Sequence, residues 1–186
     1  TEMTDDVAGL VLRDNYQQTQ AISLLEMQSA DLMSEHAAFM HSLEKASLLN
    51  RRVEFLPDDE QIDQRLKMHK GLTRPELSLI ISYGKLTYTK ALLASKLPDN
   101  PALEDWAISY FPEKLQKKFR TEIENHQLRR EIIAMSISNA VVNRMGPTFV
   151  RMTSEKTGSD IAAVTQAFML VRDAFGLQSL WANIEA

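Results

Sequence analysis

The stretch "HQLRREIIAMSISNAVVNRMGPTFV", residues 126–150, decides the fold class of this chain. Between Ile132 and Met145 its only charged side chain is Arg144, and the apolar residues recur at helical spacing. A helix that is apolar on nearly every side must be covered by other elements. The dipeptide Gly146-Pro147 then ends it. The pattern therefore predicts a central helix and an all-α protein.

This buried helix nevertheless carries polar side chains. Asn139 and Asn143 lie one turn apart, and Arg144 follows directly. In a structural interpretation, the two amides bond to backbone groups at neighbouring helix ends and fix the packing. In a functional interpretation, the amides and Arg144 line a small-ligand pocket, and an amino-acid ligand would further need Arg144 or Arg129 to converge on an acid such as Glu131. Buried amides usually serve packing, which favours the structural interpretation, but the sequence leaves both open.

The rest of the chain also has helical periodicity, with clear start and stop signals. Thr73 and Glu76 form a capping box at the start of "LTRPELSLIISYGKLTYTKALLASKLP". Gly84 lies on the apolar face of this helix with Leu77 and Tyr88, where a glycine is tolerated if another backbone packs closely. No segment has a convincing strand pattern. We expect a multi-helix, bundle-like domain of roughly eight to ten helices and no sheet.

Several helix boundaries can also be predicted. A break is expected near residues 29–31, and one helix is expected from Phe111-Pro112 through Ile123. Gly158 is the expected left-handed residue after a short helix, and Ser159 is the expected cap of the next one.

Few signals for chemistry are present. There is no cysteine, and the six glycines are too dispersed for a dinucleotide-binding loop. Glu122 and His126, one turn apart, are interpreted as an exposed helix pair rather than metal ligands. His36 lies on an apolar stripe and is expected to be a core histidine with satisfied hydrogen bonds. The sequence thus assigns no catalytic, cofactor-binding or metal-ligating residue.

The charge pattern bears on possible partners. The net charge is −4, yet residues 112–156 carry nine bases and five acids. These bases face several directions around their helices and lack accompanying aromatic residues, which favours a solvated face over a nucleic-acid site. No apolar run approaches the roughly 20 residues of a membrane span. We therefore expect neither nucleic acid nor membrane as a partner.

Five ordered motifs carry a family resemblance: "GLTRPELSLIISYGKL", "LLASKLPDNP", "YFPEKLQKKF", the opening stretch and "EKTGSDIAAVTQAF". With them the chain resembles the C-terminal part of the large bacterial NAD-specific glutamate dehydrogenases. The resemblance implies a cytosolic parent enzyme that oxidatively deaminates L-glutamate to 2-oxoglutarate and ammonia. It also implies that the catalytic residues and the NAD site lie upstream, so that this chain alone neither binds NAD nor turns over glutamate.

The resemblance also implies a domain organisation. Residues 1–28, which include "VLRDNYQQTQAISL", would lead out of the upstream catalytic domain, and residues 29–186 would form a C-terminal helical domain truncated within its last helix. The apolar stripe of that last helix, with Trp181, is then expected to be incompletely buried. Three functions stay open: a scaffold that packs against its own catalytic domain or other subunits of a homo-oligomer, a regulatory module that binds an amino acid, and an independent helical domain, either a protein-interaction module or an enzyme.

Overall fold

The computed structural model describes residues 2–185, and this part of the chain is built from α-helices and two short 3-10 turns, without a strand. The predicted all-α class is confirmed. In chain order, the elements are α1 (Glu2–Gln28), α2 (Met33–Lys45), α3 (Asp59–Lys67), α4 (Arg74–Ala94), η1 (Leu97–Asp99), η2 (Pro101–Leu103), α5 (Glu104–Ile108), α6 (Glu113–Lys118), α7 (Arg120–Glu124), α8 (Arg129–Met145), α9 (Phe149–Thr157), α10 (Ile161–Ala174) and α11 (Leu177–Glu185).

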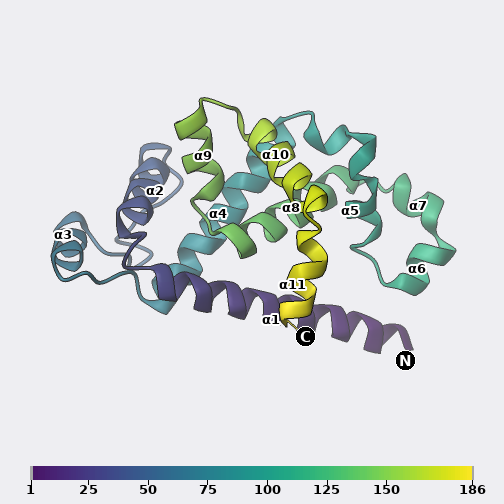
Figure 1. Ribbon diagram of the computed structural model, residues 1–186, viewed down its shortest axis with the longest axis horizontal. Coiled ribbons are helices and arrows are strands. Elements are labelled where there is room, and N and C mark those ends of the chain that lie inside the picture. Colours follow the sequence, from purple (N-terminus) through teal and green to yellow (C-terminus); the bar gives the residue numbers. More distant parts are fainter. Residues whose placement is uncertain (1, 186) are drawn as a thin grey trace.

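The two helices α4 and α8 form the centre of the molecule, with α2 and α3 at one end and α6 and α7 at the other (Figure 1). Helix α8 packs against α4, α5 and α1. Ile133, Ile137 and Val141 of α8 are fully buried in the core. The prediction that the opening stretch is a central helix is therefore confirmed.

Helix α4 approaches the turn after α8 very closely at Gly84. A Cβ atom placed on Gly84 would lie 2.6 Å from the Cβ of Pro147 and 3.0 Å from its Cα. At the next residue of α4, the carbonyl of Lys85 accepts a hydrogen bond from Ser138 Oγ of α8 at 3.1 Å. The glycine thus allows the close backbone approach that the sequence predicted.

The start of α4 is tied to α3 through the expected capping residues. Glu76 accepts a hydrogen bond from the backbone N–H of Thr73 at 2.7 Å and two from the Arg65 guanidinium at 2.6 and 2.9 Å. Burial raises the pKa of Glu76, but the hydrogen bonds from Arg65 and Thr73 outweigh it and hold that pKa below its usual value. The carboxylate therefore stays charged and joins the two helices.

Some boundaries differ from expectation. The single helix expected through Ile123 is two short helices, because Phe119 leaves helical geometry at φ −126° and ψ 35°. Asp160, and not Ser159, caps α10, where its side chain accepts a hydrogen bond from the N–H of Ala163 at 2.7 Å. The break after α1 and the left-handed Gly158, at φ 70°, are as predicted.

A buried hydroxyl pair joins α4 to α10. Tyr88 Oη lies 2.7 Å from Thr165 Oγ1, and Thr165 Oγ1 donates to the carbonyl of Ile161 at 2.6 Å. Since the Thr165 proton is used there, Tyr88 is the donor in the pair. Burial raises the pKa of Tyr88 to about 12, which keeps its proton in place.

We expect Thr165→Val to lower the free energy of unfolding by about 2 kcal/mol, since it leaves the buried Tyr88 hydroxyl without an acceptor. Tyr88→Phe removes the donor but leaves Thr165 bonded to Ile161, so it should cost only about 1 kcal/mol. Urea unfolding of both variants measures the difference. Equal losses would contradict the assigned donor direction.

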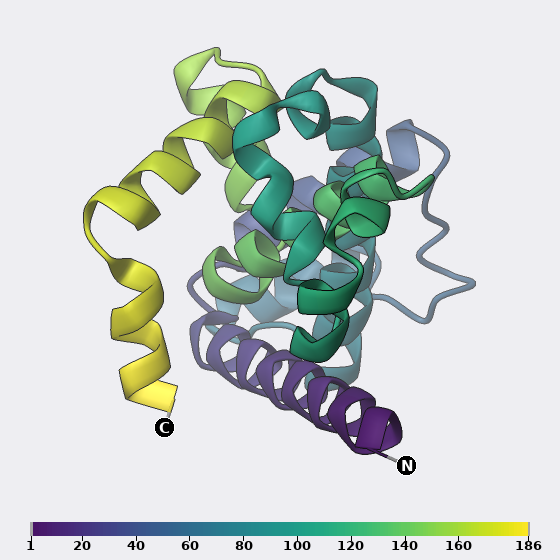
Figure 2. The ribbon, with the colours of Figure 1, turned by 90° about the vertical axis from the view of Figure 1, so that its right-hand side faces the viewer.

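The two ends of the chain lie at the periphery. The first half of α1 is largely solvent-exposed, and α10 with α11 forms an outer arm along one side of the molecule (Figure 2). Trp181 is only half-buried, and Ile184 on the same stripe is 73% exposed. The prediction that the last helix is incompletely buried is confirmed.

Candidate functional site

Helix α8 carries all five polar residues that sequence reasoning selected, but it does not bring them together. Arg129 and Glu131 lie in its first turn, and Arg144 lies in its last. At about 1.5 Å of rise per residue, roughly 20 Å of helix separates Glu131 from Arg144. Glu131 is exposed, and Arg129 donates a long hydrogen bond of 3.5 Å to the carbonyl of Pro98. The structure thus does not assemble an Arg144–Glu131 pair for an amino acid.

The neighbouring Arg130, which sequence reasoning missed, makes the stronger contacts at this end. Its guanidinium donates to the carbonyls of Leu93 and Ser95 at 3.0 and 3.3 Å and pairs with the Asp99 carboxylate. Helix α4 ends at Ala94 with no basic residue in its last turn, so its carbonyls need an outside donor. Arg130 supplies it and fixes α8 to the end of α4.

Arg144 holds the outer arm. Its guanidinium lies over the Trp181 ring at 4.9 Å, and Trp181 stacks on Phe168 at 6.5 Å between ring centroids. Phe168 in turn meets Phe149 edge-on at 6.3 Å. This series of contacts links α8, α11, α10 and α9. Because Arg144 and Trp181 are far apart in sequence, no local pattern could reveal their contact.

The amides of Asn139 and Asn143 do not play the expected role. Both side chains are half-buried, and neither forms a hydrogen bond to another residue that the structure describes. The Oδ1 atom of Asn143 is buried and has no partner there. The prediction that the amides bond to backbone at helix ends is therefore wrong. For Asn143 the physical reason is that its side chain faces α1, whose nearby residues Ala21, Leu24 and Leu25 offer apolar side chains.

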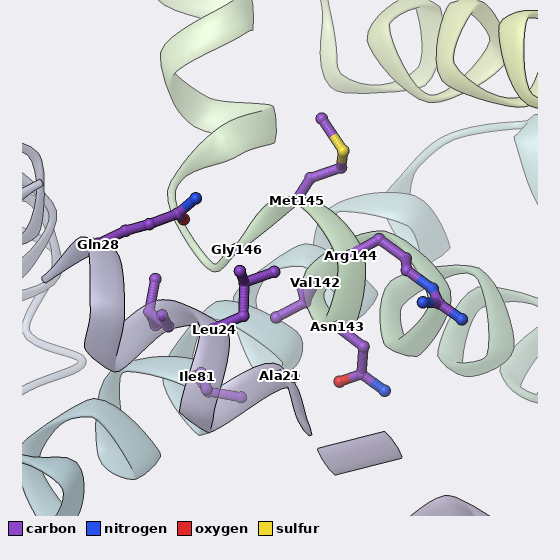
Figure 3. Close-up of a pocket in the computed structure, with 10 residues that line it drawn as sticks. Ala21, Leu24, Gln28, Ile81, Val142, Asn143, Arg144, Met145 and Gly146 are labelled. Atoms are coloured by element: carbon purple, nitrogen blue, oxygen red, sulfur yellow. The ribbon is translucent and has the colours of Figure 1, made fainter. Parts of the chain in front are cut away.

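The Asn143 amide lines a small cavity between α1 and the end of α8. Figure 3 shows the Asn143 amide directed toward α1 near Ala21, while the Arg144 guanidinium points away from it. The cavity volume is about 20 Å³, which matches one water molecule. Pockets for drug-sized ligands occupy about 300–1,000 Å³. This geometry suits hydration of the amide oxygen, and it does not suit an amino acid.

His36 on α2 is the most unusual ionisable group in the described part of the chain. It is fully buried, and neither Nδ1 nor Nε2 has a hydrogen-bond partner. His36 is therefore a core histidine, as expected, but the expectation that its hydrogen bonds are satisfied is wrong. Burial lowers the pKa of His36 to about 4, and the charge of Glu35 opposes this only in part. Without access to solvent, this neutral ring cannot reach a substrate.

Residues 2–185 contain neither a candidate metal cluster nor a candidate membrane span. No group of three or more histidine, cysteine, aspartate or glutamate side chains in this range could hold a metal ion. Within the same range, no helix is both long and apolar enough to span a membrane.

Comparisons with known proteins agree with the motifs. Residues 69–186 match the family model described as "Glutamate dehydrogenase, C-terminal". The chain is 42% identical over 185 residues to the NAD-specific glutamate dehydrogenase of Halomonas elongata, covering 100% of this chain and 12% of that protein. It is 42% identical to the enzyme of the same name from Pseudomonas aeruginosa and 33% identical to that of Mycobacterium tuberculosis; each match covers 99% of this chain and 11% of the relative. The chain thus spans about an eighth of the length of these curated relatives.

Proposed function

This chain belongs to the C-terminal region of the NAD-specific glutamate dehydrogenases, and from that premise we propose that it is a non-catalytic helical region of such an enzyme. The region packs against the rest of the dehydrogenase polypeptide and stabilises it. The parent enzyme oxidatively deaminates L-glutamate to 2-oxoglutarate and ammonia with NAD, and both the NAD site and the chemistry lie outside these 186 residues. The enzyme works in the cytoplasm as a homo-oligomer.

The observation that carries this proposal is the apolar surface of the outer arm. Leu170, Phe175 and Ile184 are 71%, 75% and 73% exposed, although they are large apolar side chains. They lie on α10, α11 and the turn between them. Single exposed apolar residues are normal, but a group of them on one arm marks an interaction surface.

The polar residues of the candidate site support the same proposal, because none of them forms a site for a substrate. The Asn143 cavity holds about one water molecule, and Arg130 and Arg144 of α8 contact the end of α4 and Trp181 of α11. The buried His36 has no access to a ligand. Arg130 and Arg144 therefore have structural uses, the Asn143 cavity is too small for a substrate, and His36 is closed to one.

The test uses the full-length polypeptide that contains this chain. We expect Phe175→Asp to lower its thermal transition by a few degrees, about 1–2 kcal/mol, because a charge would have to be buried in the interface. The KM values for glutamate and NAD should stay within about two-fold. Leu86→Asp, a change at a comparably exposed residue of α4, is the matched control and should shift the transition less. A collapse of KM or of an effector response at unchanged stability would favour a regulatory module instead.

A further inference from the structure

The loop between α2 and α3 presents one aromatic side chain to solvent. Phe55 is 90% exposed and has a left-handed backbone with φ 55°. Residues with a Cβ rarely adopt this conformation, and for a bulky aromatic residue it is an outlier. Backbone strain of this kind persists where the surrounding structure enforces it, and it gathers at functional positions. At 90% exposure, the ring buries too little surface against the described residues to offset this strain.

The residues on both sides of Phe55 hold the loop firmly. Glu54 accepts a hydrogen bond from the Tyr83 hydroxyl of α4 at 2.8 Å. Leu56 is buried, and its N–H donates to the carbonyl of Arg51 at 2.9 Å. Arg51 also donates to the carbonyl of Pro57 at 3.1 Å. The loop is therefore a rigid support that points the ring outward, and docking the ring would cost little loop entropy.

The surroundings of the ring define what it could dock into. Val53, 68% exposed, extends the apolar surface beside Phe55. Residues 51–60 carry four acids and two bases, and one of those bases, Arg51, already pairs with Glu44 and Asp59. Because Arg51 and Asp59 neutralise each other, Glu54, Asp58 and Glu60 remain against Arg52, and the segment that carries the apolar surface has a net negative charge. A negatively charged segment is repelled by phosphate-rich surfaces and complements a pocket edged by lysine or arginine.

We propose that Phe55 is an anchor that inserts into an apolar pocket with a basic rim on the rest of the dehydrogenase polypeptide, outside these 186 residues. This inference rests on the proposed function and names a contact through which the region packs. Two considerations identify the occupant. The relatives match this chain over its whole length and are about eight times longer, so the same segment is tethered to a large polypeptide in them. A tether raises the effective concentration of the second surface to about the millimolar range.

The size of the surface points to the same occupant. One aromatic side chain buries about 150–250 Å², whereas a stable interface between free proteins needs about 800 Å² from each partner. Phe55 with Val53 is therefore too small to hold a second copy of the chain by itself. It has the size of a single hot-spot residue within a larger, tethered interface.

The experiment places a photo-crosslinking residue, p-benzoylphenylalanine, at position 55 of the full-length polypeptide. Irradiation should join it to an apolar segment outside the 186 residues of the same polypeptide, identified by mass spectrometry. The same residue at Gln64, an exposed polar position on α3, is the matched control and should give at least about ten-fold less product. Crosslinks that join two copies, or a yield no higher than at Gln64, would overturn the proposal.

A second pair of variants makes the test independent of the unnatural residue. Phe55→Gly removes the ring and suits the left-handed backbone, and Leu86→Ala shortens a comparably exposed side chain of α4. In the full-length polypeptide, Phe55→Gly should raise deuterium uptake several-fold in one segment outside the 186 residues, and Leu86→Ala should not. No change outside the region would overturn the anchor.

The failure of this inference can be distinguished from failure of the proposed function. A photo-crosslinker at Phe175, on the outer arm, reports packing of the region without using the loop. If position 175 crosslinks to the rest of the polypeptide and position 55 does not, the anchor is wrong and the proposed packing stands. If neither position crosslinks outside the region, both are overturned.

Discussion

Gly84→Leu is expected to lower the free energy of unfolding of this chain by about 3 kcal/mol or more. The first added carbon already meets the Pro147 side chain at 2.6 Å and its Cα at 3.0 Å. Neither group can rotate away, because the ring of proline is closed and the other atom belongs to the backbone. Helix α4 would have to move away from the turn after α8, which opens the core around Ile81 and Val141.

The matched control is Gly9→Ala in α1, where an added Cβ has nothing within 4 Å. There the change should stabilise the chain by up to about 1 kcal/mol, since alanine favours helix over glycine. Urea unfolding of the two variants and the parent chain measures both effects. A Gly84→Leu variant that unfolds at the parent's urea midpoint would show that α4 and α8 are not packed as described.

The sequence was sufficient to predict the features that depend on local pattern. The central position of α8 follows from the absence of charge between Ile132 and Asn143, because a largely apolar helix without charge has to be covered. The role of Gly84 follows from a glycine on a buried helical face, where only a close backbone offsets its cost. The capping pair of Thr73 and Glu76 follows from a spacing of three residues, and the structure contains that hydrogen bond.

The features that depend on distant contacts could not be predicted in this way. Arg130, and not Arg129, fixes the end of α4, because the choice depends on how α8 is rotated against its neighbour. Arg144 contacts Trp181, which lies on a different helix. An asparagine in an apolar helix predicts that its amide is buried and hydrogen-bonded. The amide of Asn143 instead faces the apolar side of α1, so its oxygen is buried but has no hydrogen-bond partner among the described residues.

The exposure of apolar side chains, which bears on function, also could not be predicted from the sequence. The sequence drew attention to α8, since polar residues in an apolar helix are conspicuous. In the structure, the apolar residues Phe55 and Phe175 are exposed and are therefore candidates for contact with a partner. A sequence pattern cannot distinguish such residues from core residues. Exposure becomes visible only once the neighbours of each side chain are placed.

His36→Leu is expected to remove most of the acid sensitivity of this chain between pH 7 and pH 5. Burial lowers the pKa of His36 to about 4 in the folded state, whereas the unfolded state has a pKa near 6.5. Between these two values the unfolded state binds a proton that the folded state does not. Stability therefore falls as the pH drops from about 6.5 toward 4, and His36 adds no pH dependence above that range.

The expected size of the effect follows from the difference between the two pKa values. It amounts to about 2 kcal/mol between pH 7 and pH 5, and to about 3 kcal/mol near pH 4. At pH 7 the leucine variant should be as stable as the parent chain or slightly more so, because neither nitrogen of His36 has a hydrogen-bond partner to lose. Urea unfolding at pH 7 and pH 5 measures both quantities.

His41→Gln is the matched control, since His41 lies on the same helix but is half-exposed. Between pH 7 and pH 5, His36→Leu should lose about 2 kcal/mol less stability than the parent chain, a difference to be compared with that of His41→Gln. If His36→Leu weakened as much as the parent chain between pH 7 and pH 5, the proton would bind elsewhere in the unfolded state. A large loss at pH 7 would instead mean that His36 has a hydrogen-bond partner in the core, contrary to the structure.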